Sequence, residues 1–291
     1  MRPLVLSRRT LLKSLPIFAL PATCFAGAEA SSDEAFAIIE KGIGGRLGMA
    51  AVNTGTGRRL AYRSAERFAM CSTFKFLLAA CVLHKTEEKV EDLDRPISYG
   101  KKDLMEYAPV TREHVQEGSM TIGGLCAAAV EVSDNTAANL LLNVVGGPAG
   151  LTEFMRFLGN DVTRLDRTEP DLNDAVPGDP RDTTSPAAML DSMEKLLTGK
   201  VLKEANRDRL TGWLEQCTTG KNRLRAGIPA DWRAGDKTGT GNHGAMGDLG
   251  IFWPPGKLPF LAVAYLAEGK ASTEQREQAI AAVGRLIAER L

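Results

Sequence analysis

The stretch LGIFWPPGKLPFLAVAYL, residues 249–266, contains two apolar runs of strand length, Leu249 to Trp253 and Phe260 to Leu266. Short apolar runs that are rich in aromatic and β-branched side chains are typical of strands buried in a core. A third strand-like run, Trp232 to Thr238, precedes them in the sequence. The C-terminal part of the chain is therefore predicted to supply three strands of a sheet.

Two further strands, Leu47 to Val52 and Arg59 to Tyr62, are predicted near the other end of the chain. They are joined by Asn53-Thr54-Gly55-Thr56-Gly57, which has the residues of a hairpin turn. From about Ser72 to Leu214 the apolar residues recur mainly at helical spacing. The predicted helices of this middle region are Phe74 to His84, Thr121 to Val132, Thr136 to Val145, Leu151 to Leu158, and Pro186 to Leu197.

Helices are also predicted at both ends, for Asp33 to Lys41, with Ser32 as a possible N-cap, and for Thr273 to Arg290. We therefore expect a mixed α/β fold, of the α+β type, with one sheet built from both chain ends. The sheet lobe would span about 31–65 and 216–291, and an inserted helical lobe about 66–215. A crevice between two lobes is the expected place for a site.

Composition excludes several classes of protein. The 291 residues include 36 basic and 36 acidic side chains, and the 44% hydrophobic residues suffice for a large core. A net charge of zero argues against a nucleic-acid-binding protein that relies on a broad basic surface. Only three histidines are present, and none has the spacing of a zinc site, so no metal is expected.

The first thirty residues have the order of a secretory signal, with four basic residues, an apolar stretch from Leu15 to Phe25 and small residues ending at Ala30. Cleavage after Ala28 or Ala30 fits this order. The adjacent Arg8 and Arg9 resemble a twin-arginine export signal, and an ordinary export signal is the alternative. Removing this segment leaves 32 basic and 35 acidic residues, a net charge of −3. Cys24 leaves with it unless it is a lipid anchor, which its flanking residues fit poorly.

Ser-x-x-Lys occurs three times, at Ser72–Lys75, Ser98–Lys101 and Ser192–Lys195, so the pattern alone carries no information. Only Ser72 stands at the predicted start of a long apolar helix, where side chains three residues apart are neighbours. A hydroxyl with an amine beside it is the arrangement of an activated nucleophile, and a helix N-cap is the alternative role for Ser72.

Ser133-Asp134-Asn135 and Lys237-Thr238-Gly239 each occur once, in this order and after Ser72. The first lies between two predicted helices, where its polar side chains can point into a cleft. The second ends a predicted strand, and Gly239 allows a ligand or another backbone segment to approach closely. A helix cap and a strand end are their alternative explanations.

With these motifs, the chain resembles the class A serine β-lactamases, which combine Ser-x-x-Lys, Ser-Asp-Asn and Lys-Thr-Gly. The resemblance extends over most of the mature chain and includes residues 103–107, 164–173, 181–184 and 218–220. It implies the serine β-lactamase and penicillin-binding-protein fold, with an antiparallel sheet. The implied activity is hydrolysis of β-lactam antibiotics, and hence resistance, by a periplasmic, monomeric enzyme without cofactor. Its partners would be small β-lactams, with no nucleic acid and no membrane.

The same resemblance implies that Glu169 and Asn173 hold the water molecule that hydrolyses the acyl-enzyme. Both residues lie in a Pro/Asp-rich loop between Arg164 and Thr184. It also implies that Arg167 and Asp182 pair across the neck of this loop. A solvated glutamate is the alternative role for Glu169. Fast release of the acyl group from the serine distinguishes a hydrolase from a penicillin-binding D,D-peptidase or a β-lactam receptor. These two classes are the competing interpretations.

The resemblance further implies that Ser72 is the nucleophile, with an oxyanion hole formed by the backbone N–H groups of Ser72 and Thr240. The acylation base would be Lys75, or Glu169 acting through a water molecule. Ser133, assisted by Lys237, would pass a proton to the leaving nitrogen. The expected substrate-binding residues are Asn135, Asn173, Thr238, Gly239, Thr240, Arg223 and Tyr107.

Two of these assignments have alternatives in the sequence. In many relatives an arginine follows Lys-Thr-Gly, and Met246 occupies that position in this chain. Arg223 would take over the role of that arginine, and a surface ion pair is its alternative role. Tyr107 could be a half-buried packing residue. No disulfide is expected, because Cys71 lacks the partner seen in some carbapenem-hydrolysing relatives, and Ala79 occupies the usual partner position of Cys126.

Overall fold

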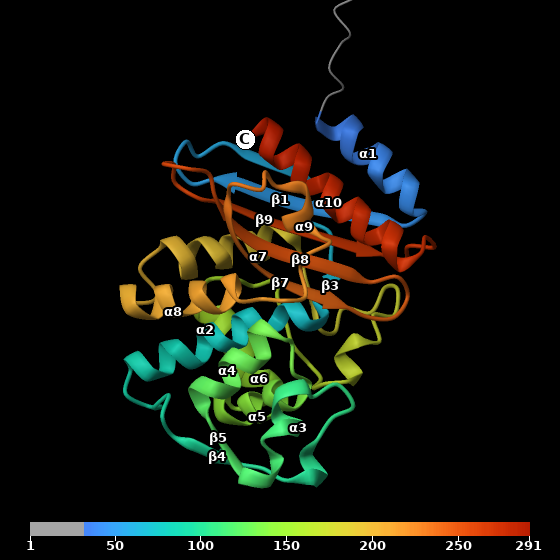
Figure 1. Cartoon of the computed structure of the whole chain (residues 1–291). Coiled ribbons are helices and arrows are strands. Elements are labelled where there is room, and N and C mark those ends of the chain that lie inside the picture. Colours follow the sequence, from blue (N-terminus) through green and yellow to red (C-terminus); the bar gives the residue numbers. More distant parts are fainter. Residues whose placement is uncertain (1–31) are drawn as a thin grey trace, which may run out of the picture. The chain divides into compact units, whose positions relative to one another are not determined.

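The computed structural model describes residues 32–291. It contains a five-stranded antiparallel sheet with the strand order β2-β1-β9-β8-β7 (Figure 1). Its strands are β1 (Arg46–Asn53), β2 (Arg59–Tyr62), β7 (Arg233–Thr240), β8 (Met246–Trp253) and β9 (Phe260–Ala267). Strand β1 pairs with β9, so that Met49 lies opposite Ala264. The prediction of one sheet from both chain ends is confirmed. The predicted export signal lies outside the described residues.

Both faces of this sheet are buried, which explains the unbroken apolar run in β9. Leu261, Val263 and Tyr265 belong to the core on the side of the central helices. The alternate residues Ala262, Ala264 and Leu266 belong to a second core. That second core is closed by α1 (Ser32–Ile43) and α10 (Thr273–Arg290), which lie over the same face in Figure 1. Because side chains alternate between the faces, a strand buried on both sides offers few positions where a polar side chain would be exposed to water.

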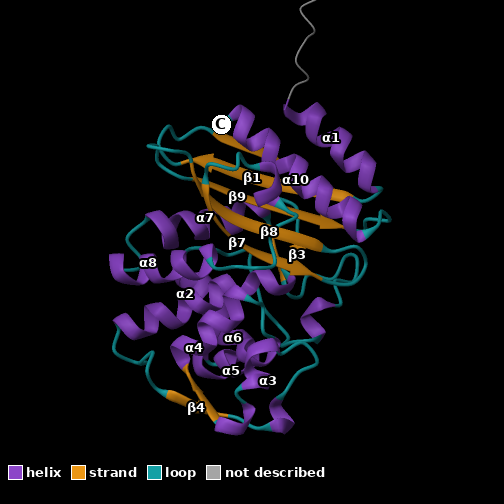
Figure 2. Cartoon of the chain, viewed as in Figure 1, coloured by secondary structure: helices purple, strands orange, loops and turns teal. Residues whose placement is uncertain are grey.

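The region between the two strand groups is mainly helical (Figure 2). Its helices are α2 (Phe74–Glu87), α3 (Pro109–Glu113), α4 (Ile122–Glu131), α5 (Asn135–Val145), α6 (Gly147–Phe157), α7 (Pro186–Met193), α8 (Glu204–Glu215) and α9 (Leu224–Gly227). Two small sheets accompany them, β3 (Phe68–Ala69) with β6 (Thr183–Thr184), and β4 (Pro96–Ser98) with β5 (Ser119–Thr121). The helix predicted for 186–197 ends at Met193 and continues as a π-helical turn, Glu194–Thr198.

Helix α2 is the central helix of the molecule, because every residue from Phe74 to Leu83 is buried. A helix that is apolar on all sides belongs in a core rather than at a surface. Ser72 precedes it, in a 3₁₀ turn formed by Cys71–Thr73, and Thr73 rather than Ser72 is the N-cap residue. The core therefore fixes the backbone on which Ser72 stands. Within residues 32–291, no helix has the length and apolar character needed to cross a membrane.

Candidate active site

A cleft of about 350 Å³ opens where strand β7 faces the turn before α2 and the loop between α4 and α5. Nine of the ten residues that line it are those predicted from the sequence, and the tenth is Thr219. The lining residues are Ser72, Tyr107, Ser133, Asn135, Asn173, Thr219, Arg223, Thr238, Gly239 and Thr240. Tyr107 lines this cleft and is half-buried, with 51% of its surface exposed.

Strand β7 passes directly against the backbone of the Ser72 turn. A Cβ atom at Gly239 would lie 2.6 Å from Met70 O and 3.1 Å from Ser72 N, which only a glycine avoids. Cys71, just before the nucleophile, has a φ of 44°, in the region that non-glycine residues rarely adopt. The predicted close approach at Gly239 is therefore confirmed, and its partner is the backbone around Ser72.

Glu169 lies between Ser72 and Lys75. Its Oε1 accepts a hydrogen bond from Ser72 Oγ at 3.3 Å and pairs with Lys75 Nζ at 3.0 Å. Lys75 Nζ also donates to Asn135 Oδ1 at 2.6 Å and to Ser133 O at 2.8 Å. No hydrogen bond joins Lys75 to Ser72 within the described chain, because the ammonium already has these acceptors. The hydroxyl and amine that the sequence predicted to be neighbours are thus linked through Glu169.

The second lysine of the site, Lys237, donates to Ser133 Oγ at 3.0 Å and to the carbonyl of Thr238 at 2.8 Å. Ser133 itself has a φ of 63°, which turns the loop between α4 and α5 toward the cleft. Burial, together with the charge of Lys75, lowers the pKa of Lys237 to about 7. Burial also lowers the pKa of Lys75, and its pairing with Glu169 opposes that effect.

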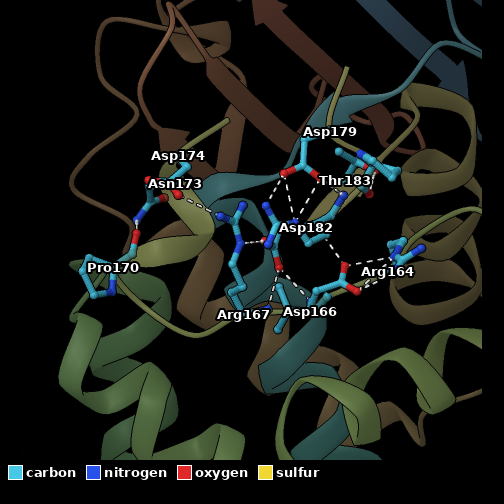
Figure 3. Close-up of polar contacts among 12 residues, drawn as sticks. Arg164, Asp166, Arg167, Pro170, Asn173, Asp174, Asp179, Asp182 and Thr183 are labelled. Atoms are coloured by element: carbon cyan, nitrogen blue, oxygen red, sulfur yellow. Dashed lines mark hydrogen bonds and ion pairs between the residues drawn. The ribbon is translucent and has the colours of Figure 1, made fainter. Parts of the chain in front are cut away.

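The loop that carries Glu169 is held by a buried ion pair at its neck (Figure 3). Arg167 Nε lies 2.6 Å from Asp182 Oδ2, and the other carboxylate oxygen of Asp182 accepts the backbone N–H groups of Asp166 and Arg167. The predicted pairing of Arg167 with Asp182 is confirmed. Because both partners are largely buried, the pair fixes the two ends of the loop to each other.

Within the loop, Asn173 Nδ2 donates to Glu169 Oε2 at 2.5 Å and to Pro170 O at 3.1 Å. Asn173 Oδ1 is buried and has no donor among residues 32–291. Asn139, on α5, holds the backbone of Glu169 from the other side: its Oδ1 accepts Glu169 N and its Nδ2 donates to Glu169 O. Glu169, at 3% exposure, is therefore not a solvated loop residue.

Arg223 lies at the far end of the cleft, where it is 5% exposed. Its Nη1 donates to the carbonyls of Gly239 and Gly247, and its Nη2 donates to Thr240 Oγ1 at 2.7 Å. Glu277 lies 3.5 Å from its Nε. This residue is therefore buried behind β7 and beside the cleft, and not part of a surface ion pair. Met246, in contrast, lies in the core at 1% exposure.

A buried polar cluster lies next to this end of β7. Asp236 Oδ2 accepts from Arg225 Nε and Asp248 Oδ2 accepts from Leu224 N, so consecutive residues of α9 hold both carboxylates. In each carboxylate, Oδ1 is buried and has no hydrogen-bond partner among the described residues. Burial raises the pKa of both groups, and the charge of Asp236 adds to the shift at Asp248.

Sequence reasoning missed several of these contacts. Asn139 follows Asn135 by four residues, so both lie on one face of α5, and that spacing was the only available signal. Thr219 Oγ1 lies 2.5 Å from Thr238 Oγ1, and nothing in the sequence of Thr218-Thr219-Gly220 indicates this contact.

Within residues 32–291 the cysteines and histidines do not line the cleft, although Cys71 directly precedes Ser72 and Cys217 contacts Thr219. Cys71, Cys81, Cys126 and Cys217 are free and buried, and burial raises the pKa of Cys71 to about 12. His84 stacks on Phe157, and His114 contacts Glu117. No group of three or more His, Cys, Asp or Glu in residues 32–291 is arranged to hold a metal ion.

The chain was compared with known proteins once this geometry was established. A family model described as the beta-lactamase enzyme family matches residues 31–291. The carbapenem-hydrolyzing beta-lactamase KPC of Klebsiella oxytoca is 46% identical over 259 residues, which cover 89% of this chain and 88% of that protein. Beta-lactamase Toho-1 of Escherichia coli is 43% identical over 281 residues, covering 97% and 96% of the two chains.

Solved structures give the same result. An ancestral class A beta-lactamase superposes with a TM-score of 0.87 at 56% identity, covering 89% of this chain and 99% of that one. The putative class A beta-lactamase PenP of Rhodopseudomonas palustris superposes with a TM-score of 0.87 at 49% identity, with the same coverage. The chain therefore belongs to the beta-lactamase enzyme family. Within that family it is a class A serine β-lactamase, an enzyme that hydrolyses β-lactams.

Proposed function

We propose that Ser72 carries the acyl group during this hydrolysis and that Glu169 serves both halves of the reaction. The observation that carries the proposal is the position of Glu169 Oε1, which accepts the Ser72 hydroxyl and pairs with Lys75. A carboxylate in hydrogen-bond contact with the nucleophile is placed to take its proton. This contact favours Glu169 over Lys75 as the acylation base.

In acylation, Ser72 Oγ attacks the lactam carbonyl carbon, its proton passes to Glu169, and the C–N bond of the ring breaks. The leaving nitrogen takes a proton from Ser133 Oγ, which Lys237 contacts at 3.0 Å. Lys75 contacts both Glu169 Oε1, at 3.0 Å, and Ser133 Oγ, at 3.4 Å, and passes the proton of Glu169 to Ser133, so that Glu169 is a carboxylate again before deacylation. A carbonyl oxygen that becomes negative would lie between the N–H groups of Ser72 and Thr240. The close packing of β7 on the Ser72 turn at Gly239 supports this arrangement.

The substrate is held along β7 and by the loop between α4 and α5. Arg223 and the hydroxyl groups of Thr238 and Thr240 form a cationic, hydrogen-bonding end of the cleft that suits the carboxylate of a β-lactam. Asn135, fixed by Lys75, would bind the amide of the substrate's side chain. Tyr107 would line the entrance.

The rate of deacylation distinguishes a hydrolase from a penicillin-binding peptidase or a receptor. The contacts of Asn173 support fast deacylation, and hence a hydrolase. Both hydrogens of its amide are used by Glu169 and Pro170, so its buried Oδ1 is left as an acceptor beside the carboxylate. A water molecule that donates to Asn173 Oδ1 and to Glu169 would satisfy this atom and stand beside the acyl group. Glu169 takes a proton from this water as the water attacks the ester carbonyl carbon, and it gives the proton to Ser72 Oγ when the C–O bond to the acyl group breaks.

Turnover of a chromogenic cephalosporin by the purified enzyme tests this proposal. We expect many turnovers per enzyme molecule, and complete loss of turnover in Ser72→Ala. Stoichiometric release of one chromophore, followed by a stable adduct, would instead indicate a peptidase or receptor. Multiple turnovers by Ser72→Ala would refute the assignment of the nucleophile.

We also propose that residues 1–30 direct export to the periplasm through the twin-arginine pathway. The support is the sequence itself, in which Arg8 and Arg9 precede an apolar stretch that ends in small residues. Replacing both arginines with lysine should leave the precursor in the cytoplasm. Unchanged export of that variant would indicate an ordinary signal peptide.

A further inference from the structure

A second hollow, of about 120 Å³, lies behind the loop that carries Glu169. One wall is formed by residues 175–181 of this loop, and the other by Phe68, Ala69, Ala245 and Ala267 of the protein body. It shares no lining residue with the catalytic cleft. At roughly 30 Å³ per water molecule, the hollow has the volume of about four waters or of one small organic molecule.

The charged residues around this hollow are mainly basic. Four arginines and two carboxylates line it: Arg46, Arg67, Arg167, Arg181, Asp179 and Glu268. Three of the arginines are paired, since Arg46 contacts Glu268, Arg167 contacts Asp182 and Asp174, and Arg181 contacts Asp179. Arg46 also contacts Glu66, so these three arginines are neutralised by their partners, and the unpaired positive charge in the lining is that of Arg67.

Arg67 differs from the other three arginines because it forms no ion pair within residues 32–291. Only its Nη1 is engaged, donating to Val162 O at 2.7 Å and to Thr183 Oγ1 at 3.0 Å. These two bonds anchor the guanidinium at the hollow, while its Nε and Nη2 donors have no acceptor in the described chain. A guanidinium offers two parallel donors that match the two oxygens of a carboxylate.

The rest of the lining is apolar. Ala69 and Ala267, which are partly exposed, form the accessible apolar wall on the body of the protein, and Val176 and Pro177 face them from the loop. Phe68 and Ala245 lie behind this surface, since they are 1% and 2% exposed and the Arg46 guanidinium covers the Phe68 ring at 4.7 Å. A purely inorganic anion would leave these surfaces without a partner. A compact apolar group attached to a carboxylate would contact them and also reach the donors of Arg67.

From this combination we propose that the hollow is a binding site for a compact organic carboxylate, such as a small aromatic acid. The carboxylate binds the free donors of Arg67, and the apolar body packs between Val176 on the loop and Ala267 on the protein body. A ligand in this position touches both walls, so it binds only when the loop is closed. Binding therefore opposes opening of the segment that carries Glu169.

Hydrogen exchange of the backbone amides of residues 175–181 tests the proposal, with benzoate as the probe and benzamide as its neutral isostere. Ionic strength is held constant with sodium chloride. We expect benzoate to slow exchange in this segment by a factor of 1 + [benzoate]/Kd, and benzamide to have much less effect. Because the catalytic cleft also attracts carboxylates, the location of the protected amides identifies the hollow.

Two sets of variants complete the test. Arg67→Gln removes the free cation, and Val176→Glu places a negative charge on a loop residue that is 47% exposed, with Val176→Gln as its matched control. Slowing by benzoate should be lost in Arg67→Gln and in Val176→Glu and retained in Val176→Gln. Equal slowing by benzamide, no slowing in the wild type, or full slowing in both Arg67→Gln and Val176→Glu would overturn the proposal.

Discussion

Replacing Asp182 with asparagine tests whether the neck of the loop positions Glu169. The carboxylate of Asp182 accepts Arg167 Nε at 2.6 Å and the N–H groups of Asp166 and Arg167. An asparagine oxygen can still accept the two backbone groups. Its amide nitrogen, however, would face Arg167 Nε as a second donor, so the ion pair is lost and a repulsive contact replaces it.

The expected cost follows from burial. The side chain of Asp182 is 1% exposed and that of Arg167 is 16% exposed, so the arginine charge is left with little solvent. Breaking one partner of a buried pair typically costs about 3–5 kcal/mol. The lower value, about 3 kcal/mol, fits here because Arg167 also contacts the exposed Asp174. For a protein of this size, it corresponds to a fall in Tm of about 6–12 °C.

The assay combines thermal unfolding with single-turnover acylation and deacylation rates. Asp174→Asn is the matched control, since Asp174 binds the same arginine at 2.8 Å but is 51% exposed. We expect that control to lose less than about 1 kcal/mol. In Asp182→Asn, deacylation should slow more than acylation, because the attacking water depends on both Glu169 and Asn173. Equal stability of the two variants, or equal slowing of both steps, would refute the reasoning.

Three further predictions follow from the site and its surroundings. Arg223→Ala should raise KM for carboxylate-bearing substrates by about 10–100-fold, since a hydrogen bond to a charged group contributes about 1.5–3 kcal/mol; unchanged kinetics would refute its role. Gly241→Cys should form a disulfide with Cys71, because a Cβ at Gly241 would lie 2.6 Å from Cys71 Sγ. Thiol titration of the unfolded mature protein should then detect three free thiols, those of Cys81, Cys126 and Cys217, whereas five free thiols would contradict the prediction. Asp248→Asn should gain stability over the wild type as the pH rises above about 4. The raised pKa of Asp248 keeps this group protonated in the folded state at pH values where it is already ionised in the unfolded state. The free energy of unfolding of the wild type therefore falls by about 1.4 kcal/mol per pH unit until the pH reaches the folded-state pKa. A difference in Tm that does not change with pH would contradict this assignment.

The strands could be predicted because the sheet is buried on both faces. The runs at 249–253 and 260–266 are short and separated by Pro254-Pro255-Gly256, which favours strands over a buried helix such as α2. The start of β8 was missed by three residues, since Met246-Gly247-Asp248 contains a glycine and an aspartate that are uncommon in strands. Asp248 is tolerated there because Leu224 N supplies a hydrogen bond and burial favours its neutral form.

The candidate site was predictable where local motifs carry the chemistry, as at Ser72, Ser133 and Lys237. It was not predictable where a contact joins residues that are distant in sequence and ordinary in type. Asn139 holds Glu169 across 30 positions, and Arg67 borders the second hollow as an unremarkable surface arginine. Such contacts depend on how the loop folds back on the protein body, which residue spacing does not specify.

Intact-protein mass spectrometry of Glu169→Ala, mixed with a penicillin, tests the central claim most directly. The account predicts an adduct of one penicillin mass on Ser72 that forms more slowly than in the wild type, because Lys75, whose pKa falls further without Glu169, must replace it as the acylation base. The adduct then persists for many turnover times of the wild type, because the group that activates the water is gone. A wild-type sample treated in the same way should return to its unmodified mass. Rapid return of Glu169→Ala to the unmodified mass would contradict the assignment of Glu169 to deacylation.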